Sequence, residues 1–107
     1  MEIYQKFAKA TTLYKCHYFF KTSTSQAADE SQRVKLNRIS DSLLVQASTI
    51  ALQTGGESLN TKISRQGEVE FRKFMEEVER LPTTPERNER FGTFIRSCAA
   101  TAGVKLE

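Results

Sequence analysis

The sequence predicts a mainly α-helical protein of about four helices, with one short strand at residues 33–38 that forms a ribbon between two subunits. The alternative fold is an all-α helical bundle. Apolar residues recur at alternating steps of three and four along most of the chain, which is the spacing of one buried helix face. Only five glycines and two prolines interrupt the 107 residues, so the chain can form long helices.

A chain of 107 residues is long enough for one domain and too short for two. We expect a single domain, residues 1–107, with an N-terminal helix at residues 1–21, a core at residues 33–67 and C-terminal helices at residues 68–103. Seven Phe and three Tyr supply large side chains for its interior.

The apolar stripe of residues 2–21 predicts the first helix. Tyr4, Phe19 and Phe20 lie off this stripe, so the helix is apolar on more than one side and offers surface to a second subunit or a later helix. The residues predicted to face the core are Ile3, Phe7, Ala10, Tyr14 and either His17 or Tyr18.

Two interpretations compete for residues 26–54. In the first, Ser25 caps one helix that runs through the whole stretch, which contains no Gly or Pro. In the second, residues 33–38 form a strand, and a shorter helix begins after Ser40 or Asp41 as its N-cap. In the first interpretation the core face of the helix consists of Leu36, Ile39, Leu43, Ala47 and Ile50.

Gly55 and Gly56 end this helix, since glycine readily takes the left-handed conformation of a helix C-terminus. Ser58 then caps a further helix, which stops before Pro82. Gly67 lies inside the apolar stripe of that helix and would weaken it by about 1 kcal/mol relative to Ala, so we expect a close helix contact or a local break there. The stripe consists of Leu59, Ile63, Gly67, Phe71, Phe74, Val78 and Leu81.

The last helix is predicted to begin with Thr84 as its cap and Pro85 at the first helical position, where the missing N–H is not needed. Gly103 sits where a C-terminal cap belongs. The buried face of this helix is predicted to contain Phe91, Phe94 or Ile95, Cys98 and Ala102.

The sequence offers few groups for catalysis or metal binding. His17 is the single histidine, and CxxC, HExxH and glycine-rich phosphate loops of recognised spacing are absent. Cys16 is adjacent to His17, but neighbouring residues on a helix point about 100° apart and do not form a nucleophile and base pair. We therefore expect no enzymatic activity, no cofactor and no metal site.

The two cysteines, Cys16 and Cys98, are expected to be buried, reduced thiols rather than a disulfide. No apolar run approaches the roughly 20 residues that span a bilayer, so no membrane partner is expected. Residues 1–20 carry Glu2 and several lysines where a signal peptide would be apolar. These observations together predict a cytoplasmic protein.

The net charge of +3 is unevenly distributed. Residues 1–40 hold seven Lys or Arg against three acids, whereas residues 41–81 hold five against seven. A basic surplus in the first forty residues is compatible with an anionic partner such as nucleic acid, although a mild surplus is more often a solvated face.

Three segments of the chain resemble the ribbon–helix–helix family of Arc-type repressors and ParD-type antitoxins. They are VKLN at residues 34–37, ISDSLL at residues 39–44 and GGESLNTKI at residues 55–63. They match, in order, the strand, the capped helix and the glycine turn with the opening of a second helix. The resemblance implies a homodimer that binds double-stranded DNA as a transcriptional regulator or an antitoxin-like protein.

The resemblance also implies roles for individual residues. Paired strands would enter the major groove, where Lys35, Asn37 and Arg33 would read base edges. Backbone N–H groups at the start of the second helix would hold a phosphate, and nearby basic side chains would contact further phosphates. The residues predicted to contact DNA are Arg33, Lys35, Asn37, Arg38, Ser58, Asn60 and Lys62.

The alternative function is that of an all-helical protein-interaction module, an adaptor or inhibitor without nucleic-acid binding. Amphipathic helices joined by glycine form a plain helical hairpin, which needs no DNA to explain it. Such a module would offer the Phe-rich faces of residues 3–20 or 71–95 to a protein partner.

Overall fold

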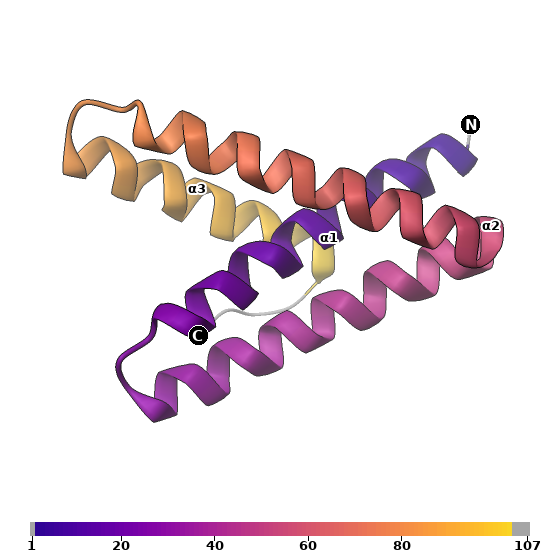
Figure 1. The fold of residues 1–107 in the computed structure, drawn as a ribbon, viewed down its shortest axis with the longest axis horizontal. Helices are drawn as coiled ribbons and strands as arrows, with labels where there is room; N and C mark the ends of the chain where they lie inside the picture. The colour runs from indigo at the N-terminus through magenta and orange to yellow at the C-terminus, as the bar shows by residue number, and fades with distance from the viewer. Residues whose placement is uncertain (1, 104–107) are drawn as a thin grey trace.

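The computed structural model describes residues 2–103 and contains three helices: α1 (Glu2–Gln26), α2 (Glu30–Glu79) and α3 (Thr84–Ala102) (Figure 1). No strand occurs within these residues. The prediction of a mainly α protein is therefore confirmed, and the all-α alternative describes the fold. We expected about four separate helices, and the described residues form three. The reason is that the chain on both sides of the glycine pair belongs to α2, although the backbone at the two glycines themselves is not helical.

The predicted strand and intersubunit ribbon at residues 33–38 are not found, because these residues lie within α2. Asp29 is the N-cap of this helix, and its side chain accepts a hydrogen bond from the backbone N–H of Ser31 at 3.0 Å. Ser25 lies inside α1, and Ser40 and Asp41 lie in the middle of α2, so none of these predicted caps starts a helix. With a cap at Asp29 and no Gly or Pro before Gly55, nothing interrupts the helix.

A kink at Gly55 and Gly56 divides α2 into a first segment, residues 30–54, and a second segment, residues 57–79. Gly56 has a φ of 73°, in the left-handed region that favours glycine. The two segments extend from this kink like the arms of a V, and α3 runs back along the second segment (Figure 1). The predicted chain reversal at the glycine pair is confirmed.

Helix α1 crosses the second segment of α2 at Gly67. A Cβ atom placed on Gly67 would lie 2.5 Å from the Cβ of Tyr14, 3.0 Å from the backbone N of Lys15 and 3.2 Å from the carbonyl O of Thr11. Only glycine lets the two helix backbones approach this closely. The close helix contact expected at Gly67 is therefore confirmed.

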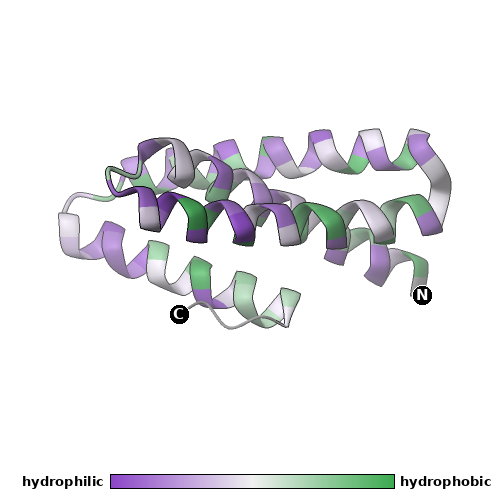
Figure 2. Ribbon diagram, turned by 90° about the horizontal axis from the view of Figure 1, so that it is seen from below, coloured by the Kyte–Doolittle hydropathy of each residue, from purple (hydrophilic) through white to green (hydrophobic). Residues whose placement is uncertain are grey.

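The core lies between α1 and the inner faces of the other helices, and apolar and polar residues alternate along each helix accordingly (Figure 2). The stripe predicted for α1 is buried only from Ala10 onward. Ile3 and Phe7 precede the crossing at Gly67 and are 65% and 39% exposed, so their predicted burial is wrong. The buried apolar residues are Ala10, Leu13, Tyr14, Cys16, Phe19, Phe20, Leu43, Ala47, Ala51, Ile63, Phe74, Val78 and Cys98.

Aromatic rings join α3 to the other helices. The ring of Phe94 lies 4.9 Å from that of Phe19 and 4.4 Å from that of Phe74, measured between centroids. The Nζ atom of Lys15 lies 5.4 Å from the ring centroid of Phe74 and 5.3 Å from that of Phe94. Most Phe side chains of α1, α2 and α3 thus pack within the chain, whereas Phe7 is 39% exposed. Whether the Phe-rich faces of residues 3–20 or 71–95 bind a partner stays a prediction.

The ends of α3 follow the predicted pattern with a shift of one residue. Thr83, not Thr84, is the N-cap, and its Oγ1 accepts a hydrogen bond from the backbone N–H of Glu86 at 3.3 Å. Pro85 lies in the first turn, and Gly103 closes the helix with a φ of 68°. Two threonines precede Pro85, and the sequence did not distinguish which of them is the cap.

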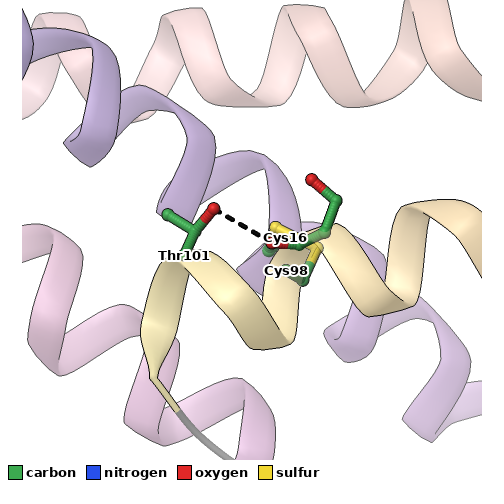
Figure 3. Close-up of a disulfide and its surroundings, with 4 residues drawn as sticks. Cys16, Cys98 and Thr101 are labelled. Carbon is green, nitrogen blue, oxygen red and sulfur yellow. Dashed lines mark hydrogen bonds between the residues drawn. A yellow bond between two sulfur atoms is a disulfide. The ribbon is translucent and has the colours of Figure 1, made fainter.

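A disulfide between Cys16 and Cys98 joins α1 to α3, with their Cα atoms 5.9 Å apart (Figure 3). The prediction of two reduced thiols is therefore wrong. Both cysteines lie on buried helix faces, as predicted, but a sequence separation of 82 residues gives no spacing from which their pairing could be recognised.

Candidate protein-interaction surface

Helix α1 is fixed to the first segment of α2 by a buried polar contact. The Nδ1 atom of His17 lies 2.8 Å from the carbonyl O of Ser40 and 3.0 Å from its Oγ. A carbonyl oxygen only accepts hydrogen bonds, so Nδ1 carries a proton in this contact. Burial lowers the pKa of His17 below its usual 6.5 and thus favours the neutral ring. This histidine serves packing between helices.

Two tyrosines fix α1 to the second segment of α2. The hydroxyl of Tyr14 donates a hydrogen bond to Oδ1 of Asn60, and the hydroxyl of Tyr18 lies 2.7 Å from Oγ of Ser64. Both pairs repeat after four residues, so they follow one face of each helix. Burial raises the pKa of Tyr14, with a smaller contribution from Tyr18. The side chain of Asn60, a predicted DNA contact, is thus used within the protein.

The other predicted DNA contacts lie on exposed helix surface. Arg33 donates from Nε to the carbonyl O of Ala27 at 3.1 Å, next to the turn between α1 and α2. Lys35 and Asn37 are two positions apart on a helix, so they point about 200° apart and do not share a face as they would in a strand pair. The predicted contacts found exposed are Arg33, Lys35, Asn37, Arg38, Ser58 and Lys62.

The ion pairs found among the described residues lie on the surface. Arg72 with Glu68 and Arg90 with Glu77 are exposed ion pairs at 3.5 and 3.0 Å. Between residues 2 and 103 there is no group of three or more side chains suited to hold a metal ion. Within the same range no helix has the length and apolar character needed to cross a membrane.

The N-terminal turns of α1 carry three exposed apolar residues that are neighbours on one side of the helix. Residues 3–9 precede the crossing at Gly67, and all of them are exposed. Ile3, Tyr4 and Phe7 are 65%, 80% and 39% exposed. Their spacing places them within about 100° of one another around the helix axis. We name these three residues the N-terminal apolar face; this end of α1 projects past α2 (Figure 1).

Other exposed apolar residues are more dispersed. Val34, Val45 and Leu52 are 48%, 62% and 41% exposed along one side of the first segment of α2. Polar residues such as Arg38, at intermediate positions of the same side, separate them. Isolated surface apolar residues are normal in folded proteins, whereas contiguous ones indicate a contact surface.

The sequence placed Ile3 and Phe7 in the core because both residues continue the core stripe of α1 without a break. The available signal was Tyr4, which lies off that stripe. Comparison with known proteins adds no further assignment: no protein-family model matches the chain, and no curated protein or solved structure is significantly similar to it.

Proposed function

We propose that this chain is an all-helical protein-interaction module, which inserts the N-terminal turns of α1 into an apolar groove of a partner protein. The observation that carries the proposal is the exposure of Ile3, Tyr4 and Phe7 on one helix face. Helices that bind in grooves use anchors spaced by one turn, as Ile3 and Phe7 are. Large aromatic and aliphatic anchors of this kind supply most of the energy of such interfaces.

The rest of α1 supports this role by holding the helix in place. After the exposed residues 3–9, the helix packs against Gly67, makes the Tyr14 and Tyr18 hydrogen bonds and is joined to α3 through Cys16. A helix that is already formed and fixed loses less conformational entropy on binding than a free peptide. The fold therefore favours binding by the exposed end.

Charge indicates the chemistry of the partner. Lys6 is exposed and lies about 60° from Ile3 around the helix axis, beside the N-terminal apolar face, whereas Lys9 lies on the opposite side of the helix. A groove with an apolar floor and an acidic rim next to Lys6 would complement this face. A second copy of this chain would bring a second Lys6 to the contact instead of an acidic group. We therefore favour a different protein over the homodimer that the sequence led us to expect.

The test replaces the three anchors by good helix formers in the full chain, as Ile3→Gln, Tyr4→Gln and Phe7→Gln. The matched control is Val34→Gln, Val45→Gln and Leu52→Gln, which removes a similar apolar exposure from α2. Partners are captured with a photo-crosslinker at position 4, identified, and titrated against each variant.

We expect the anchor variant to bind the identified partner at least 100-fold more weakly and the control variant to bind normally, because the loss of a single buried anchor costs about 2 kcal/mol or more, which is roughly 30-fold. Equal loss in both variants, or none, would overturn the proposal. If sedimentation instead reveals a concentration-dependent dimer that only the anchor variant abolishes, the surface is a homodimer contact.

DNA binding as a transcriptional regulator or antitoxin-like protein is the second candidate. It is favoured by Lys35 and Arg38, which are exposed and lie about 60° apart on one side of α2. Binding would then proceed from a helix rather than a ribbon. The experiment is titration of duplex DNA at low and high salt: binding that weakens with salt and with Lys35→Ala and Arg38→Ala supports it, and no binding at low salt excludes it.

A cytoplasmic location remains a prediction, and the Cys16–Cys98 disulfide weighs against it, because disulfides persist mainly in oxidising compartments. Alkylation of free thiols in intact cells, followed by mass spectrometry of both cysteines, measures the oxidised fraction. A mostly reduced pair would support the reducing cytoplasm.

A further inference from the structure

Helix α3 is covalently held at both of its ends. Residues 80–83 join its N-terminus to α2, and the disulfide joins Cys98, near its C-terminus, to α1. Cys98 is the one fully buried residue of α3 within the described part of the chain, and the other residues of its inner face are half-buried. Helix α3 therefore contacts the other helices through a narrow strip of residues that includes Cys98.

Cavities flank this strip on both sides. One, of about 300 Å³, opens between Phe91 and Ile95 of α3 and the side chains of Phe19, Phe71 and Met75. Another, of about 250 Å³, opens between Phe94, Thr93 and Ser97 of α3 and the side chains of Lys15 and Phe74. Both cavities are open to solvent, so the side chains of α3 that line them face water on one side and pack against the protein on the other.

The polar contacts of α3 with the rest of the described chain lie near residues 80–83. Arg87 donates from Nε to the carbonyl O of Leu81 at 3.0 Å and from Nη2 to that of Glu79 at 3.2 Å. Arg90 forms its exposed ion pair with Glu77 one turn further along. Toward the C-terminus, Thr101 bonds within α3 to the carbonyl O of Ser97 (Figure 3). That end of α3 is attached by the disulfide and by the packing of Phe94, Ile95 and Ala102 against the core.

We propose that the Cys16–Cys98 disulfide is a redox-sensitive latch, which keeps α3 in place only while it is oxidised. Its reduction releases α3, which then rotates about residues 80–83 and exposes the aromatic rings of Phe19 and Phe74. The reductant is a dithiol. One of its thiolates attacks a cysteine sulfur, the protein S–S bond breaks, and a mixed disulfide forms. The second thiolate then displaces the protein sulfur, so the dithiol becomes a disulfide and the protein gains two thiols.

Burial of the sulfurs adds a kinetic consequence. Cys16 and Cys98 are 0% and 1% exposed, so a dithiol reaches them only during transient local opening of the helices around them. The latch is therefore slow to reduce while α3 is closed. It is also independent of the N-terminal apolar face, since residues 3–9 lie on the far side of the Gly67 crossing from Cys16.

The test is hydrogen exchange of the full chain in three forms: oxidised, reduced with a dithiol, and with Cys16→Ser and Cys98→Ser. We expect amides of residues 91–102 to exchange at least tenfold faster in the reduced and Ser forms. Amides of residues 10–20 and 60–75 should lose protection only through the lower stability of the whole fold, and should still exchange at least tenfold more slowly than those of residues 91–102. Adding the dithiol to the Ser form should change nothing further, which controls for effects of the reagent itself.

Each other outcome overturns the proposal. Unchanged protection of residues 91–102 after reduction means that packing alone holds α3. An equal loss of protection through all three helices, in both the reduced and Ser forms, means that the disulfide stabilises the whole fold and is not a latch on one helix. Reduction that is as fast as that of an exposed model disulfide means that α3 does not gate access to the sulfurs.

Discussion

Gly67 lies under Tyr14 at the point where α1 crosses α2, with room for a hydrogen but not for a methyl group. The atoms that an added Cβ would meet are the Cβ of Tyr14 and the backbone N of Lys15, which move only if α1 moves. The close approach of α1 and α2 at this crossing therefore requires glycine at position 67. It also sets where burial of α1 begins and where its exposed end starts.

We expect Gly67→Ala to lower the free energy of unfolding by about 1–3 kcal/mol, since overpacking outweighs the gain of about 1 kcal/mol in helix propensity. Denaturant titration measures the change. Gly92→Ala is the matched control, because its Cβ would meet only the flexible end of Arg96 at 3.3 Å. That variant should be more stable by about 0.5–1 kcal/mol. Stabilisation by both variants would contradict the close crossing.

The hydrogen bond from Tyr14 to Asn60 is expected to couple α1 to α2 energetically. Tyr14→Phe and Asn60→Ala should each lower the free energy of unfolding, and the double variant should lower it by less than the sum. We expect a coupling of about 0.5–1.5 kcal/mol, typical of a neutral hydrogen bond. Tyr18→Phe combined with Asn60→Ala should be additive, since Tyr18 contacts Ser64 instead.

The sequence predicts which residues share a buried helix face. It does not predict where α2 begins or which residues far apart in the sequence contact one another. The stripes at Leu43 and Ala47 and at Ile63 and Phe74 are buried as their spacing predicts. The strand predicted at residues 33–38 failed because alternation of Val34 and Leu36 with polar residues also fits a helix surface, and a cap at Asp29 decided between the two.

Pairings across the fold have no local signal. Nothing near Cys16 in the sequence indicates Cys98, and nothing near His17 indicates Ser40. The burial of Ile3 and Phe7 was predicted wrongly for a related reason: periodicity tells which residues share a face, but only the position of the Gly67 crossing tells where along α1 that face becomes covered.

The N-terminal apolar face should contribute little to folding. Ile3→Gln, Tyr4→Gln and Phe7→Gln together should change the free energy of unfolding by less than about 1 kcal/mol, because exposed substitutions remove few contacts. Leu13→Ala, at a position with 0% exposure, should cost about 2–5 kcal/mol. Thermal and denaturant unfolding compare them. A large loss from the first variant would mean that these residues are part of the core.

Removal of the disulfide should lower overall stability even where it leaves most of the fold intact. Cys16→Ser with Cys98→Ser opens a loop with a sequence separation of 82, for which the chain-entropy estimate is about 4 kcal/mol. Denaturant titration of the oxidised and Ser forms measures the difference. A change below about 1 kcal/mol would show that the closed loop does not restrict the unfolded chain.

His17 should make stability depend on pH between about 7.5 and 5.5. Burial, and to a lesser degree the nearby Lys21, lowers its pKa, while the Ser40 carbonyl and Asp41 raise it less than burial lowers it. In this range the unfolded chain, with a pKa near 6.5, therefore binds more protons than the folded protein. Stability from this residue is complete above the unfolded pKa and is lost as the pH falls below it.

The measurement is the free energy of unfolding across that range, compared with His17→Asn, which keeps a donor for the Ser40 carbonyl but does not titrate. We expect the native protein to lose stability toward pH 5.5 and the Asn variant to lose distinctly less. Carboxylates titrate mostly below this range and affect both proteins alike. Parallel pH profiles would mean that the pKa of His17 is the same in the folded and unfolded chain, and that the Ser40 contact holds the charged ring as well as the neutral one.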